Sequence, residues 1–136
     1  ADGQLLVNGR AIMFRGINRH DFDPDHGWAV PEHRYREDLL AAKRLNINAI
    51  RCSHYPNPQV FYDLCDELGL YVIDECDLET HGVRRRNVPG DNPVWTAAVV
   101  DRMERMVLAT KMTGDFLATI VIPICIFHIN MNTRIS

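Results

Sequence analysis

The chain has 136 residues, of which 24% are charged and 46% are apolar, and its formal net charge is −3. This length suits one small domain and is too short for a complete eight-unit α/β barrel of about 250 residues. The balanced charge excludes a strongly basic nucleic-acid-binding domain, and the longest apolar run, at residues 116–127, is too short to span a membrane.

The first third of the chain predicts a hairpin followed by a loop and a helix. Residues 5–14 read as two short strands around Asn8-Gly9, the pair that a tight hairpin turn prefers. Residues 16–20 are expected to end the second of these strands with polar groups. After a loop rich in Asp, Pro and Gly, residues 32–45 have the apolar spacing of a helix.

The rest of the chain alternates between short apolar strands and amphipathic helices. The expected elements are a strand from 48 to 51, a helix over 59–68, a strand over 70–74, a loop over 78–92 and a helix over 93–108. Gly69 is placed to end the helix over 59–68. This alternation predicts an α/β fold with a parallel sheet and crossover helices.

Polar residues follow three of the predicted strands at their carboxyl ends. They are Asn18 to His20, Arg51 to His54, and Asp74 to Glu79. Because the carboxyl ends of parallel strands meet at one edge of the sheet, we expect a ligand site there.

The stretch from Asp74 to Gly82 holds four carboxylates and one imidazole. These carboxylates repel one another unless partners or a cation offset their charge. Glu79 and His81 lie two residues apart, so an extended chain points both to one side. A divalent cation site and a solvated acidic loop with a capping histidine both fit the pattern.

The run from Asn48 to Ile73, NAIRCSHYPNPQVFYDLCDELGLYVI, closely resembles the signature of glycoside hydrolase family 2. The family pattern has an Asn, an apolar residue, an Arg, two small residues and His-Tyr-Pro, followed later by a Gly and four apolar residues. The Glu-Thr-His-Gly segment that begins at Glu79 resembles the long β-galactosidases of this family. The resemblance implies a partial (β/α)8 TIM barrel, about its first three βα units, preceded by the hairpin.

The resemblance also implies roles for individual residues. Asn18, His20 and His54 are expected to bind the galactosyl group, with the two histidines stabilising the transition state. Arg51 is expected to orient the nucleophilic carboxylate. Glu79 and His81 are expected to bind Mg²⁺, with Mn²⁺ as an alternative because imidazole is an unusual Mg²⁺ ligand.

The resemblance is strong over residues 1–108, and we treat residues 109–136 as a divergent tail. Family members place their acid/base in an Asn-Glu pair, and no such pair occurs in this chain. The family nucleophile lies on a later strand. We therefore expect this chain alone to be inactive, although the implied reaction is retaining hydrolysis of β-galactosides. Residues 116–127 are expected to form a replacement strand or an aggregation-prone segment.

Other interpretations remain open at this point. One is a barrel fragment without catalytic activity that keeps residual metal or sugar binding. Another is a metal-dependent hydrolase of a different barrel family. The expected partner is a β-galactoside, without nucleic acid or membrane, and the resemblance implies homo-oligomers for full-length proteins.

The four cysteines are widely spaced and form no CxxC pair. This spacing does not favour a zinc knuckle, and it fits a reducing compartment. The amino terminus has no secretory-signal pattern. We therefore expect a cytoplasmic protein in which Cys52 and Cys76 behave as small buried apolar residues.

Overall fold

The computed structural model describes residues 3–78, 92–111 and 119–121. Strands β1 (Leu6–Val7) and β2 (Arg10–Ala11) form the predicted antiparallel hairpin. Asn8 and Gly9 connect them with positive φ angles of 50° and 76°. This is the backbone conformation that a two-residue primed turn requires, so the predicted hairpin is confirmed.

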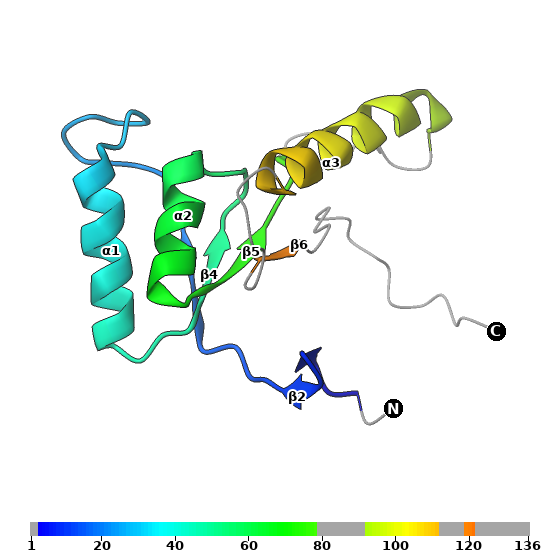
Figure 1. The fold of residues 1–136 in the computed structure, drawn as a ribbon. Coiled ribbons are helices and arrows are strands. Elements are labelled where there is room, and N and C mark those ends of the chain that lie inside the picture. Colours follow the sequence, from blue (N-terminus) through cyan, green and yellow to red (C-terminus); the bar gives the residue numbers. More distant parts are fainter. Residues whose placement is uncertain (1–2, 79–91, 112–118, 122–136) are drawn as a thin grey trace.

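Four parallel strands form the main sheet, in the order β3 (Gly16–Arg19), β4 (Ala49–Cys52), β5 (Tyr71–Asp74) and β6 (Thr119–Val121). Helices lie between the successive strands along the chain (Figure 1). The predicted α/β class with a parallel sheet is therefore confirmed. Strand β6 lies within residues 116–127, for which a replacement strand was one of two expectations.

The prediction that residues 16–20 end the second hairpin strand is wrong. Strand β2 ends at Ala11, and β3 is a separate strand in the parallel sheet. The Asn48 side chain makes two hydrogen bonds to the backbone between β2 and β3. Its Oδ1 accepts from Arg15 N–H at 2.7 Å, and its Nδ2 donates to the Met13 carbonyl at 2.9 Å. A side chain from a distant segment thus replaces the ladder hydrogen bonds here.

The helices begin and end close to their predicted bounds. Helix α1 spans Glu32–Arg44 and α2 spans Gln59–Leu68. Gly69 ends α2 with a φ of 65°, as predicted. The last predicted helix begins as a 3₁₀ turn, η2 (Pro93–Trp95), and continues as α3 (Thr96–Lys111). None of the helices in the described ranges is long and apolar enough to cross a membrane.

Helices α1 and α2 pack side by side on one face of the sheet and enclose the core (Figure 1). The buried residues of this core include Tyr35, Leu39, Ile50, Cys52, Phe61, Leu64, Cys65 and Val72. Cys76 is also buried. Burial raises the pKa of the Cys52 thiol well above its ordinary value and raises that of Cys65 to about 12. Cys52 and Cys76 are therefore buried as predicted.

Strand alternation separates the core from the site. Ile50 and Cys52 of β4 belong to the helix-covered core, so Arg51 between them points to the opposite face. In the ladder between β3 and β4, Arg51 is the register partner of Asn18. This opposite face therefore presents polar residues near the carboxyl ends of the strands.

Candidate active site

Arg51 lies at the centre of a polar cluster that joins the ends of three strands. Its Nε donates to Glu75 Oε1 at 2.6 Å, and its Nη1 donates to Asn18 Oδ1 at 3.3 Å. His54 Nδ1 lies 2.7 Å from the other carboxylate oxygen of Glu75. The predicted convergence of Asn18, Arg51 and His54 at one edge is therefore present in the structure.

Glu75 is the member of this cluster that the sequence motifs did not identify. Its side chain is only 2% exposed, and Arg51 and His54 engage both of its carboxylate oxygens. A carboxylate bound and buried in this way is suited to holding Arg51 and His54 in place, not to attacking a substrate. Strand alternation was an available signal, because Asp74 faces the core and the next residue must face the site.

The contact with Glu75 fixes the tautomer of His54. A ring nitrogen 2.7 Å from a carboxylate carries the proton, so Nδ1 donates and Nε2 is the nitrogen not engaged by Glu75. Arg51 Nη2 lies 3.3 Å from the same Nδ1, and since both groups are donors this is a contact without a hydrogen bond. The His20 ring packs edge-on against the His54 ring at 5.6 Å, so the two predicted histidines lie together.

A buried hydrogen-bond network supports Glu75 from the core side. Asp74 is fully buried; its Oδ1 accepts from Glu75 N–H at 3.0 Å and its Oδ2 accepts from the Tyr62 hydroxyl at 2.8 Å. The Tyr62 hydroxyl accepts in turn from Asn57 N–H at 2.9 Å. Burial raises the pKa of Asp74 to about 6, although both hydrogen bonds act to lower it.

Arg19 performs a similar supporting role between β3, α1 and the loop after β4. Its guanidinium donates to Asp21 at 2.8 Å, to Asp38 at 3.0 Å and to Asn57 at 3.2 Å. It also lies over the Tyr35 ring, at 5.1 Å from the centroid. These contacts fix the start of the loop after β3, and with it the segment that carries His20.

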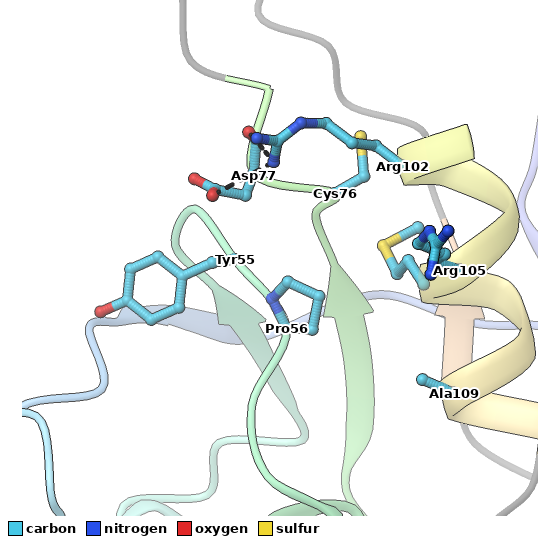
Figure 2. Close-up of a pocket in the computed structure, with 8 residues that line it drawn as sticks. Tyr55, Pro56, Cys76, Asp77, Arg102, Arg105 and Ala109 are labelled. Atoms are coloured by element: carbon cyan, nitrogen blue, oxygen red, sulfur yellow. Dashed lines mark hydrogen bonds and ion pairs between the residues drawn. The ribbon is translucent and has the colours of Figure 1, made fainter. Parts of the chain in front are cut away.

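A groove of about 330 Å³ lies between the loop after β4, the end of β5 and α3 (Figure 2). Tyr55 and Pro56 line it on one side, and Arg102, Met106 and Ala109 line it on the other. Arg102 donates to the Asp77 carbonyl at 3.0 Å, which ties α3 to the end of β5. Arg51, His54 and Glu75 do not line this groove, although Tyr55 and Cys76 follow His54 and Glu75 in the chain.

The predicted metal ligands Glu79 and His81 lie outside the described residues. Among the residues described, His, Cys, Asp and Glu form no group of three or more suited to a metal ion. The predicted Mg²⁺ or Mn²⁺ site therefore stays a prediction.

Residues 1–114 match the family model described as "Glycosyl hydrolases family 2, TIM barrel domain". The chain belongs to glycosyl hydrolase family 2. This agrees with the α/β fold and with the polar cluster at the carboxyl ends of the strands, where barrel enzymes hold their active sites.

Relatives within family 2 include several β-galactosidases. This chain is 54% identical to the β-galactosidase of Arthrobacter sp. (strain B7) over 111 residues, which cover 79% of the chain and 11% of that protein. It is 46% identical to that of Pectobacterium atrosepticum over 107 residues, covering 79% of the chain and 10% of that protein. The chain thus spans about a tenth of the length of these relatives.

A solved family 2 structure with a broad match is the β-galacturonidase of Eisenbergiella tayi bound to galacturonate. The two share 32% identity at a TM-score of 0.65, covering 82% of this chain and 19% of the other. The fold described here is therefore similar to part of a known family 2 structure.

Proposed function

We propose that this chain supplies the opening part of the catalytic barrel of a β-galactosidase-type hydrolase. The observation that supports it most is the cluster of Arg51, His54 and Glu75 at the carboxyl edge of the sheet, in a chain 46–54% identical to β-galactosidases. In this proposal the four parallel strands are part of an eight-stranded barrel.

Retaining hydrolysis needs one carboxylic acid and one carboxylate about 5 Å apart. Glu75 does not suit either role, because both of its oxygens are engaged and its side chain is buried. In our proposal Glu75 holds Arg51 and His54, and His20 and His54 bind sugar hydroxyls where positive charge develops on the ring. Carboxylates elsewhere in the longer enzyme perform the bond cleavage.

A chimaera tests this function directly. Residues 1–108 of this chain replace the matching segment of the Arthrobacter β-galactosidase, and hydrolysis of nitrophenyl β-galactoside is measured. We expect the chimaera to be active, and we expect His54→Ala to lower kcat/KM by about 100-fold, the effect of removing one transition-state contact.

The matched control is Glu67→Gln in the same chimaera, because Glu67 pairs with Arg36 on the helix surface away from the cluster. This control should leave kcat/KM unchanged. A folded chimaera without activity would contradict the proposal. Hydrolysis of nitrophenyl β-galacturonide in preference to the galactoside would favour instead the activity of the Eisenbergiella tayi relative.

We also propose that Glu79 and His81 bind Mg²⁺, as the resemblance implies. The proposal rests on their sequence motif alone. Titrating the chain with Mn²⁺ and following the free ion by electron paramagnetic resonance provides the test. Glu79→Gln and His81→Asn should each weaken binding about tenfold or more, whereas the control His33→Asn should not. Equal affinity in all four proteins would contradict this site.

A further inference from the structure

The turn between β1 and β2 exposes an Asn-Gly pair to solvent. Asn8 and Gly9 are both exposed, and a Cβ atom built on Gly9 would meet no atom within 4 Å beyond its chain neighbours. The strand register pairs Val7 with Arg10, so the ladder ends on either side of this turn. Water therefore reaches both residues of the pair, and the Gly9 N–H lies outside the ladder.

An asparagine that precedes a glycine can lose its side-chain amide without an enzyme. The backbone nitrogen of the glycine gives up its proton and attacks the side-chain carbonyl carbon, and ammonia leaves as a cyclic succinimide forms. Water then opens the ring at either of its two carbonyl carbons. One opening gives aspartate, and the other gives isoaspartate, in which the main chain runs through the former side chain. Glycine favours the attack because it has no Cβ to obstruct it.

The hairpin holds this turn only weakly. Strands β1 and β2 have two residues each, and an isolated two-stranded hairpin is marginally stable in water. In the part of the chain that the structure describes, these strands form a sheet of their own, separate from the sheet of β3 to β6. Opening of the hairpin therefore gives Asn8 the freedom to bring its side-chain carbon to the Gly9 nitrogen.

Asn46 provides a comparison within the same chain. Like Asn8, it is exposed and has a positive φ, of 58°. The residue after it is the β-branched Ile47, whose N–H donates to the Ala42 carbonyl at 3.0 Å. The nitrogen that would have to attack is thus both shielded and hydrogen-bonded, so we expect Asn46 to be stable.

Other asparagines in the described ranges are protected in different ways. Asn57 and Asn92 precede prolines, which have no N–H to lose. Both polar atoms of the Asn48 amide are hydrogen-bonded to the backbone. Asn18 lies within β3, and its Oδ1 accepts from Arg51. Among these residues, only Asn8 combines exposure with a following glycine.

The two products of this reaction differ in what they do to the hairpin. Aspartate tolerates a positive φ and suits the same turn. Isoaspartate adds a carbon to the main chain, so the two-residue turn no longer matches the pairing of Leu6 with Ala11. The disturbance should end before β3, because the Asn48 side chain holds the backbone at Met13 and Arg15.

We propose that Asn8 is a site of spontaneous deamidation, and that its isoaspartyl product opens the hairpin of β1 and β2 while the candidate active site stays intact. The reaction consumes water and releases ammonia, and it needs no other reagent. This inference does not depend on the proposed function.

The chain is incubated in mildly alkaline buffer, with and without urea, and then digested for mass spectrometry. Isoaspartate is measured by methyl transfer from labelled S-adenosylmethionine with a protein isoaspartate methyltransferase. We expect the peptide with Asn8 to convert about tenfold faster than the peptide with Asn46 in the native chain. Asn8→Gln should abolish most of the methyl transfer, because the longer side chain closes a less favourable ring.

The aspartyl and isoaspartyl forms are then separated and compared by proton NMR. We expect the contacts between Leu6 and Ala11 to persist in the aspartyl form and in Asn8→Asp, and to disappear in the isoaspartyl form. The ring signals of His54 should be the same in all of these proteins.

Conversion of Asn8 in urea but not in the native chain would overturn the inference, because the folded turn would then protect this residue. Equal conversion at Asn46 in the native chain would overturn the structural reason given for the choice of Asn8. An isoaspartyl form that keeps the contacts between Leu6 and Ala11, or that shifts the His54 signals, would contradict the expected effect on the fold.

Discussion

Replacing Glu75 with glutamine is expected to lower the free energy of unfolding by about 2–3 kcal/mol. Glutamine has nearly the same shape but turns one acceptor oxygen into a donor. Since Arg51 and His54 both donate to Glu75, the new amide sets a donor against one of them. It also leaves the positive charge of Arg51 without its buried counterion. Urea unfolding followed by circular dichroism gives the measurement.

The matched control is Glu67→Gln, which removes a charge from an ion pair of similar geometry on the surface. Arg36 donates to both oxygens of Glu67, at 2.8 Å and 2.9 Å, but both side chains are about half exposed. Water replaces lost contacts there, so we expect a change below about 1 kcal/mol. An equal decrease in the free energy of unfolding of the two variants would show that burial does not strengthen the Glu75 interactions.

Replacing Asp74 with asparagine is expected to remove a pH-dependent term from the stability of the chain. The pKa of Asp74 is about 6 in the folded protein against an ordinary value of 3.8, because burial disfavours its charge. The folded state thus keeps the proton more strongly than the unfolded state. The contribution of this carboxyl to the free energy of unfolding is fully present below pH 3.8 and is lost as the pH rises through about 6.

The experiment compares the free energies of unfolding of the two proteins at about pH 4 and about pH 7. In Asp74→Asn the new side chain keeps one acceptor for Glu75 N–H, and its amide can donate to the Tyr62 hydroxyl. The variant should therefore gain about 2 kcal/mol relative to the wild type as the pH rises over this interval. A difference that does not change with pH would contradict the raised pKa.

Asp101→Asn provides the control. Arg105 lowers the pKa of this exposed carboxyl by a hydrogen bond, so its contribution is present above the ordinary pKa and is lost as the pH falls. Its replacement should make the variant less stable than the wild type by a small amount that stays nearly constant between about pH 4 and about pH 7. The stability difference of the Asp74→Asn variant should change over this interval, and that of the Asp101→Asn variant should not.

The sequence predicted most of the fold because local chemistry decided it. The Asn8-Gly9 turn, the Gly69 helix end and the apolar runs at β4 and β5 are each set by neighbouring residues. The start of β3 was missed because it depends on a residue far away in sequence. The side chain of Asn48 forms hydrogen bonds with the backbone of Met13 and Arg15, just before this strand. No local pattern contains that information.

The candidate site was predicted in part for the same reason. Asn18, Arg51 and His54 stand at recognisable strand ends, and the parallel sheet brings them together. Glu75 was hidden among several carboxylates in one acidic run, where sequence alone does not say which one is buried. The contact between the rings of Trp28 and Tyr55 was also missed, because these residues become neighbours only when two loops meet.

The pairing of Asn18 with Arg51 across β3 and β4 restricts which insertions and deletions this part of the protein can accept during evolution. Removing one residue from β4 would exchange its two faces, turning Arg51 toward the helices and Cys52 toward the candidate active site. Side chains in the loop between β3 and α1 do not alternate between two faces of a sheet. The length of this loop can therefore change without exchanging the faces of any strand. The length of that loop can therefore evolve while the strands keep theirs.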